Sequence, residues 1–305
     1  MRPNWMVCLS SLLVFSACGV EDSTPSEDRP PDDEPTARLV ATVDGLAGPE
    51  AVKYDAAQDA YFIANFGPAA EEQRDANGFI SLVGSDGTIR NRAFITGLEG
   101  QPLHMPRGMA LQGDRLWVAD VDGVHAFHRV TGAAQDFVDF RSFEPGFLND
   151  IAISPDGVVY VTDTGRGRVY EIRDGAPAIA VEDDRTGPPN GITWDEGRSA
   201  FILAPWGGGQ VIGAWAPDGG FEEVITVDGG NFDGVEVLND LILLASQNDS
   251  ALWVVEGATA RRALRLAGQP ADIGVDPERG RVAIPYISRN LVEIWALPEL
   301  LPPAG

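Results

Sequence analysis

Residues 147–163 read FLNDIAISPDGVVYVTD: a polar pair leads into an apolar strand, a Ser-Pro-Asp-Gly turn and a second apolar strand. Short apolar runs with period two between Pro- and Gly-containing turns are typical of antiparallel β-strands. The opening of this segment recurs along the chain, so the sequence is built from repeats. The other five copies are GPEAVKYD at 48–55, MPRGMALQ at 105–112, PNGITWDE at 189–196, FDGVEVLN at 232–239 and PADIGVDP at 270–277.

Alignment of the six copies places one residue at the head of each first strand, and we call these the ring positions. A second strand such as VVYVTD, a third such as RVYEIR and a more variable fourth follow within each repeat. Four strands in a repeat of about 40 residues are typical of a propeller blade. We therefore predict an all-β fold, a six-bladed β-propeller. The ring positions are Glu50, Arg107, Asn149, Asn190, Asp233 and Ala271.

The two ends of this repeat array predict how the ring closes. The last repeat stops after its third strand, LVEIWAL, whereas the array is preceded by an extra strand, ARLVATV, at 37–43. That strand resembles the fourth strands FEEVITV and ARRALRL of other repeats. We expect it to complete the sixth blade, which would leave no open edge in the ring. The propeller domain is predicted to span 37–305.

Composition limits the partners. The chain has 22 basic and 46 acidic residues, a formal net charge of −24. Such a charge disfavours nucleic acid and anionic lipid as partners and favours cations. The alternative, without any functional role for the charge, is a solvated acidic surface.

Residues 1–17 have the layout of an export signal. Arg2 precedes an apolar run that is too short to span a bilayer, and the run ends in Phe-Ser-Ala-Cys. This end resembles a bacterial lipobox, which implies cleavage before Cys18 and a lipid anchor on its thiol and new amine. Gly19 is compatible with outer-membrane sorting and a periplasmic location, and ordinary secretion is the alternative. The acidic, proline-rich segment 18–36 is predicted to be a disordered tether.

The ring positions also predict a site. In a radial array, equivalent positions meet near the axis, so Glu50, Asp233, Asn149 and Asn190 would share one mouth with Arg107. Two carboxylates and two carboxamides are hard oxygen ligands suited to Ca²⁺. No His or Cys occupies a ring position, which disfavours zinc or copper. A polar channel without a metal is the alternative.

The segments GPEAVKYD, FLNDIAISPDG, PPNGITWD and FDGVEV resemble the inner-strand motifs of the gluconolactonase and regucalcin family (also called senescence marker protein) and of the related paraoxonases. The resemblance covers 37–305 and looks closest to uncharacterised bacterial exported members. It implies a six-bladed propeller with a divalent cation, commonly calcium, held by Glu50, Asn149, Asn190 and Asp233.

The resemblance implies a metal-dependent hydrolase of a lactone or similar ester, with water activated by Asp233 or another ring carboxylate. Arg107 would hold a substrate carboxylate or stabilise developing charge, unless it pairs internally with Glu50 or Asp233. Phe147 stands where gluconolactonases carry an Arg, and the paraoxonase histidines are missing. The alternative is a non-enzymatic surface propeller with a structural ion, whose loops bind a protein or glycan.

Four further residues are candidates for the surroundings of the mouth. Asp120 and Asp163 end second strands, where they would either orient ring side chains or accept hydrogen bonds from turn amides. Trp206 follows a second strand and is expected to line the mouth. His104 lies in the loop entering the second blade and would also be within reach.

Overall fold

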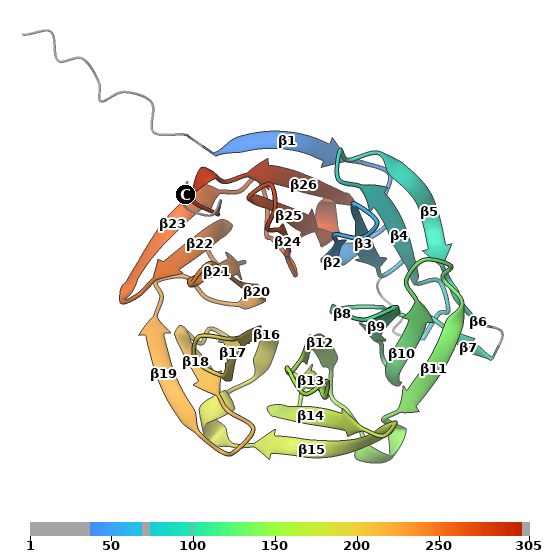
Figure 1. Cartoon of the computed structure of the whole chain (residues 1–305), viewed down its shortest axis with the longest axis horizontal. Coiled ribbons are helices and arrows are strands. Elements are labelled where there is room, and N and C mark those ends of the chain that lie inside the picture. The colour runs from blue at the N-terminus through green and yellow to red at the C-terminus, as the bar shows by residue number, and fades with distance from the viewer. Residues whose placement is uncertain (1–36, 69–73, 99, 301–305) are drawn as a thin grey trace, which may run out of the picture. The chain divides into compact units, whose positions relative to one another are not determined.

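The structure is a computed structural model that describes residues 37–68, 74–98 and 100–300. The predicted signal peptide 1–17, the lipid-bearing Cys18 and the tether 18–36 lie outside the described residues. Within them, six four-stranded antiparallel sheets are arranged in a ring (Figure 1). The predicted all-β, six-bladed propeller is therefore confirmed.

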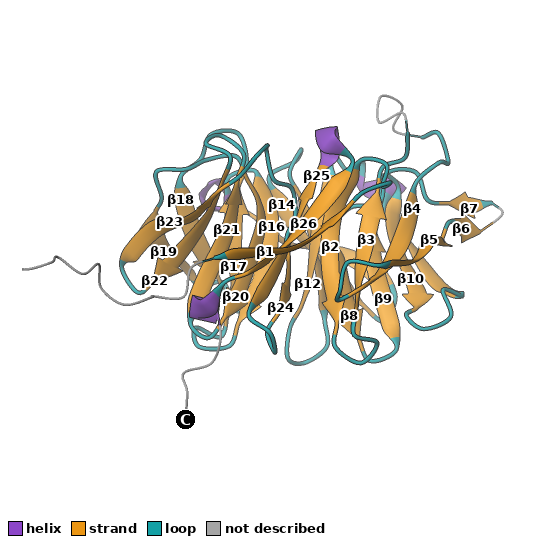
Figure 2. Ribbon diagram, turned by 90° about the horizontal axis from the view of Figure 1, so that it is seen from above, coloured by secondary structure: helices purple, strands orange, loops and turns teal. Residues whose placement is uncertain are grey.

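The first strand of each blade lies nearest the axis and the fourth lies at the outside (Figure 1). Figure 2 shows the same strands from the side. Blade 1 contains β2 (Pro49–Asp55), β3 (Ala60–Asn65), β4 (Phe79–Gly84) and β5 (Ile89–Ile95), and blade 2 contains β8 (Met109–Gln112), β9 (Arg115–Ala119), β10 (Gly123–His128) and β11 (Ala134–Asp139). Blade 3 contains β12 (Leu148–Ile153), β13 (Val159–Asp163), β14 (Arg168–Arg173) and β15 (Ala176–Glu182), and blade 4 contains β16 (Pro189–Asp195), β17 (Ala200–Pro205), β18 (Val211–Trp215) and β19 (Phe221–Thr226). Blade 5 contains β20 (Phe232–Leu238), β21 (Leu241–Ser246), β22 (Ala251–Glu256) and β23 (Thr259–Arg265), and blade 6 contains β24 (Gly274–Asp276), β25 (Arg281–Tyr286), β26 (Leu291–Ala296) and β1 (Arg38–Val43).

The short elements outside the blades are a β6 (Gly97–Leu98) and β7 (Gln101–Pro102) hairpin and the 3₁₀ turns η1 (Arg141–Phe143), η2 (Asp184–Thr186), η3 (Ile287–Arg289) and η4 (Pro298–Leu300). Among the described residues, no helix has the length and apolarity needed to cross a membrane.

The N-terminal strand closes the ring as predicted. β1 pairs antiparallel with β26, from Arg38 opposite Ala296 to Val43 opposite Val292. Figure 1 shows β1 as the outermost strand of the last blade. Blade 6 therefore combines three strands from one end of the chain with one strand from the other.

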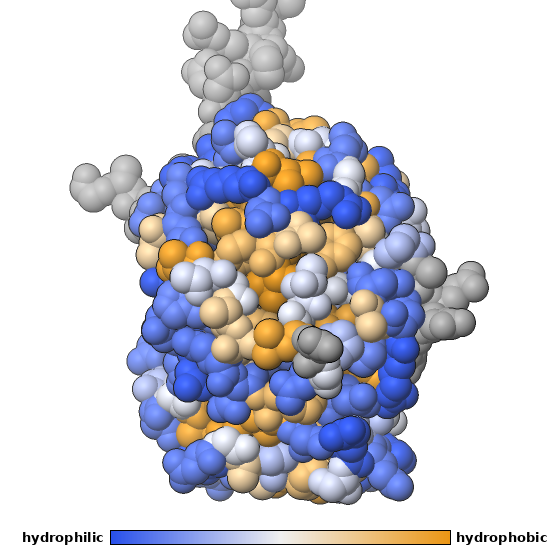
Figure 3. Space-filling view, turned by 90° about the vertical axis from the view of Figure 1, so that its right-hand side faces the viewer, coloured by the Kyte–Doolittle hydropathy of each residue, from blue (hydrophilic) through white to orange (hydrophobic). Residues whose placement is uncertain are grey.

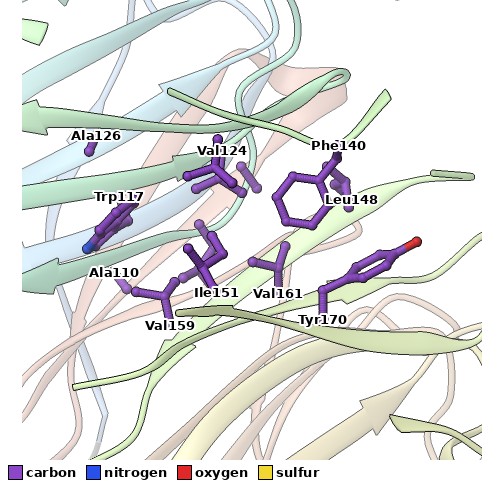
Figure 4. Close-up of a cluster of buried hydrophobic side chains, with 13 residues drawn as sticks. Ala110, Trp117, Val124, Ala126, Phe140, Leu148, Ile151, Val159, Val161 and Tyr170 are labelled. Atoms are coloured by element: carbon purple, nitrogen blue, oxygen red, sulfur yellow. The ribbon is translucent and has the colours of Figure 1, made fainter. Parts of the chain in front are cut away.

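Apolar side chains fill the spaces between adjacent blades. Figure 4 shows one such cluster, in which Trp117 and Val124 of blade 2 face Ile151 and Tyr170 of blade 3. All six residues of β3, β17 and β21 are buried, because the second strand of a blade has neighbouring sheets on both faces. Most residues of the fourth strands β5 and β11 are exposed or half-buried, and the side of the molecule seen in Figure 3 is largely hydrophilic with apolar patches.

Candidate metal centre

A repeated bulge positions the ring side chains. In β2, β12, β16 and β20, the ring residue is the second residue of the strand. The pairing register with the second strand shifts at that point in all four blades. A bulge turns a side chain away from the regular alternation of the strand. The same local irregularity therefore recurs at each of the four predicted metal ligands.

The four predicted ligands line one cavity of about 550 Å³, and we call this set of buried side chains its floor. Glu50, Asn149, Asn190 and Asp233 all line it, and each is at most 5% exposed. Asn190 Nδ2 donates a hydrogen bond to Asp233 Oδ1 at 3.0 Å. Gln247 Nε2 donates to Asp233 Oδ2 at 2.6 Å. Asn149 Nδ2 donates a hydrogen bond to the hydroxyl of Thr164 at 3.0 Å.

Two oxygens on this floor have no hydrogen-bond partner among the described residues. Glu50 Oε2 and Asn190 Oδ1 are both buried and unpaired. Leaving a buried polar atom unsatisfied costs about 1–3 kcal/mol, so such atoms call for an explanation. Both are hard oxygen donors, and the adjacent Asp233 supplies a second carboxylate. The donor set therefore fits a hard divalent cation such as Ca²⁺.

The candidate centre differs from a cluster of charged ligands. Among the described residues, no three His, Cys, Asp or Glu side chains are grouped as metal ligands. Only Glu50 and Asp233 would contribute charge, and Asn149 and Asn190 would contribute neutral amide oxygens. Two charges leave a bound divalent cation neutralised but not over-neutralised.

The two carboxyl groups have raised pKa values. Burial raises the pKa of Glu50 well above 4.5, and the charge of Asp233 raises it further, whereas the charge of Arg107 lowers it. Burial raises the pKa of Asp233 to about 7, against the opposing hydrogen bonds from Asn190 and Gln247. Without a cation, these groups therefore hold their protons to higher pH than exposed carboxyl groups do. Cation binding would release those protons.

Arg107 lies beside this floor but does not line the cavity. It is only 1% exposed, and its Nη1 donates to the carbonyl oxygen of Leu148 at 3.0 Å. Its guanidinium carbon is 3.7 Å from the centre of the Phe147 ring. Within the described part of the chain, it forms no ion pair with Glu50 or Asp233, so the alternative of internal pairing is not observed there. Its charge acts on Glu50 without direct contact.

A second polar layer, which the sequence analysis missed, lies next to the ring. Asp150 and Asp272 directly follow ring positions in blades 3 and 6 and are buried. Burial raises the pKa of Asp150 to about 7 and that of Asp272 well above its ordinary value. On β2 and β20, three residues after the ring positions Glu50 and Asp233, Lys53 Nζ lies 2.7 Å from Glu236 Oε1 and joins blades 1 and 5. The repeats show where these acidic residues occur in the sequence. Which of them pair across blades depends on the stagger between neighbouring sheets, which the repeats do not show.

The residues that end second strands hold the turns that lead into the ring. Asp120 accepts hydrogen bonds from the backbone amides of His104 at 2.8 Å and Met105 at 2.7 Å. Asp163 accepts one from the amide of Phe147 at 2.8 Å. Of the two roles considered for these aspartates, acceptance from turn amides is thus the one observed. They fix the chain just before Arg107 and Asn149.

The structure places the two aromatic candidates, Trp206 and His104, in different cavities. Trp206 lines the central cavity, as expected. His104 does not, because it lines a different hollow beside Asp120 and His125. Its Nδ1 accepts a hydrogen bond from the amide of Ala76 at 3.1 Å. The expectation that His104 reaches the mouth was therefore wrong.

A scan against models of protein families and a search of curated proteins both gave no match. Among solved structures, the fold is similar to that of a gluconolactonase from Xanthomonas campestris, with a TM-score of 0.66 and 15% identity, covering 86% of this chain and 89% of that one. It is also similar to regucalcin, a calcium-binding protein from Agrobacterium tumefaciens, with a TM-score of 0.64 and 18% identity over 85% and 92%.

Virginiamycin B lyase from Staphylococcus aureus is a third similar structure, with a TM-score of 0.59 and 11% identity over 86% and 99% of the two chains. At these identities, the comparisons establish the fold. That fold is the propeller type of gluconolactonase and regucalcin, as the sequence motifs indicated.

Proposed function

We propose that this protein is a calcium-dependent hydrolase of a lactone or related ester, exported and anchored to a membrane through Cys18. The observation that carries the proposal is the pair of buried, unpartnered oxygens of Glu50 and Asn190 at the floor of an open cavity. The similarity of the fold to a gluconolactonase and to a calcium-binding regucalcin supports it.

Each floor residue then has a role. Glu50, Asn149, Asn190 and Asp233 would hold the cation, which when bound would polarise the ester carbonyl and stabilise negative charge on it. Asp233 is fixed on both oxygens by Asn190 and Gln247. Because a bound cation would favour its ionised form, Asp233 would be the carboxylate that accepts a proton from water.

Arg107 would act indirectly. Its guanidinium is buried behind the Phe147 ring, so it contacts no ligand in the cavity. Its positive charge lowers the pKa of Glu50 and thereby favours the ionised carboxylate that a cation requires. We therefore assign Arg107 as a positioning residue.

A second candidate is a non-enzymatic propeller with a structural ion and a protein or glycan partner. It is favoured by the shortage of acid–base groups, because Glu50 and Asp233 are the only titratable residues among the described ones that line the cavity. If both are fully engaged by an ion, no free base remains.

Calorimetric titration of the chelator-treated protein with Ca²⁺ separates these cases. We expect one ion to bind, binding to be lost in Asp233→Ala and retained in a control, Asp228→Ala, which changes an exposed acid. Hydrolysis of lactones that requires Ca²⁺ would support the enzyme. Calcium binding without hydrolysis of any lactone or ester would favour the structural ion, and no binding would overturn the metal centre.

The anchor has its own test. Cys18→Ala should move the protein from the membrane fraction to the soluble exported fraction. An unchanged distribution between the two fractions would contradict a lipid on Cys18.

A further inference from the structure

The wall of the cavity above the floor is built by equivalent positions of the repeats. The first residue after the second strand lines the cavity in five of the six blades. Residues directly preceding β12 and β16 complete the wall between them. The five post-strand residues are Phe66, Thr164, Trp206, Gln247 and Ile287, and the two preceding residues are Phe147 and Pro188.

Most of this wall is apolar, and two of its polar groups, the Thr164 hydroxyl and the amide nitrogen of Gln247, already have hydrogen-bond partners. The hydroxyl of Thr164 accepts a hydrogen bond from Asn149 and donates one to the carbonyl oxygen of Pro189 at 2.8 Å. The amide nitrogen of Gln247 donates to Asp233. The wall therefore has few groups left to replace the water around a polar ligand, although the floor beneath it is strongly polar.

A cavity with an apolar wall and a polar floor discriminates between ligands by their polarity. A hydroxyl buried without a partner lowers affinity about fivefold or more, so a ligand with several hydroxyls would lose affinity at each of them. An apolar group gains by leaving water, at about 0.8 kcal/mol per methylene, which is about fourfold in affinity. A volume of about 550 Å³ accommodates a small organic molecule with a side chain.

We propose that the cavity takes the lactone or ester of an apolar acid, with its alkyl or aryl part against Phe66, Phe147 and Trp206, and discriminates against polyhydroxylated sugar lactones. The polar head of the substrate points to the floor formed by Glu50 and Asp233. This inference rests on the hydrolase function proposed above and adds its substrate class.

The test uses two parallel series with the calcium-loaded protein. Hydrolysis is measured for γ-lactones with alkyl side chains of increasing length and for glucono-δ-lactone. Binding of the matching γ-lactams, which resist hydrolysis, is measured by calorimetry. Trp206→Ala removes part of the wall, and Trp295→Ala on β26 is the control, with thermal melting as the check on folding.

We expect lactam affinity and lactone kcat/KM to rise about fourfold per methylene until the wall is covered. Trp206→Ala should flatten this rise, whereas Trp295→Ala should not. Glucono-δ-lactone should be hydrolysed at least a hundredfold more slowly than the best alkyl lactone.

The two proposals fail in different ways. Preference for glucono-δ-lactone, or no dependence on chain length, would overturn the apolar substrate class and leave the hydrolase intact. Lactam binding that strengthens with chain length, without hydrolysis of any lactone or ester, would support the apolar ligand class and overturn the hydrolase. Binding of no lactam would overturn the apolar site.

Discussion

Replacing Asp233 with Asn should change how the stability of the calcium-free protein depends on pH. Asp233 is 5% exposed, and burial raises its pKa from 3.8 to about 7. A carboxyl whose pKa is raised by folding stabilises the folded state below its unfolded pKa. This contribution is lost as the pH rises through the folded pKa. The calcium-free protein should therefore become less stable between pH 4 and pH 8.

The magnitude follows from the pKa difference. A pKa raised from 3.8 to about 7 contributes about 4 kcal/mol to the free energy of unfolding at pH values below 3.8. Roughly 2–3 kcal/mol of this contribution is lost between pH 5 and pH 8. In Asp233→Asn, this part of the pH dependence should disappear. The variant places one amide nitrogen opposite Asn190 or Gln247, which should cost about 1 kcal/mol at pH 5. At pH 8, it should be at least as stable as the parent protein.

Urea unfolding of chelator-treated protein at pH 5 and pH 8 measures these differences. Asp228→Asn makes the same chemical change at an exposed position and should follow the parent at both pH values. Saturating Ca²⁺ should reduce the loss of stability in the parent, because a bound cation favours the ionised carboxylate. If Asp233→Asn lost as much stability as the parent between pH 5 and pH 8, the buried carboxyl of Asp233 would not be the titrating group.

Deletion of 37–44 should lower the free energy of unfolding by roughly 5 kcal/mol, at about 1 kcal/mol for each ladder hydrogen bond to β26, and should abolish cooperative thermal melting. Unchanged melting would refute closure of the ring by β1. Gly234→Ala should lower the free energy of unfolding by about 2 kcal/mol or more, because a Cβ at this position would lie 2.5 Å from the amide nitrogen of Ile273. As a control, a Cβ at Gly220 would have its nearest contacts at 3.6 Å, so Gly220→Ala should melt like the parent protein. Arg107→Ala should lower calcium-dependent turnover about tenfold or more at the acidic end of the pH profile, with a smaller loss as the pH rises, because the charge of Arg107 lowers the pKa of Glu50. If the variant and the parent had equal activity across the whole profile, Arg107 would have no part in the mechanism.

The repeat made much of this architecture predictable. Strand period and turn composition are local properties, so six copies of one pattern were enough to give the number of blades. The ring positions followed because equivalent residues of a closed array face the same axis. Closure by residues 37–43 followed because the last repeat lacked one strand.

Contacts between blades were not predictable in the same way. The sequence gives no direct measure of the stagger between neighbouring sheets, so the Lys53–Glu236 ion pair was missed. Phe147 was noticed as the residue in place of an Arg, but its contact with Arg107 depends on the path of the turn held by Asp163. His104 was misplaced because its loop is held toward Ala76 and away from the mouth.

The pairing of β1 with β26 has a consequence for biosynthesis. Arg38 is among the first described residues to leave the ribosome, and its partner Ala296 is among the last. The blades between them can form in order during translation or export, but the ring cannot close before the final blade is made. Until then, the unpaired edges remain available to other chains. A chain that stops before β26 would keep every predicted metal ligand and still lack the closed ring.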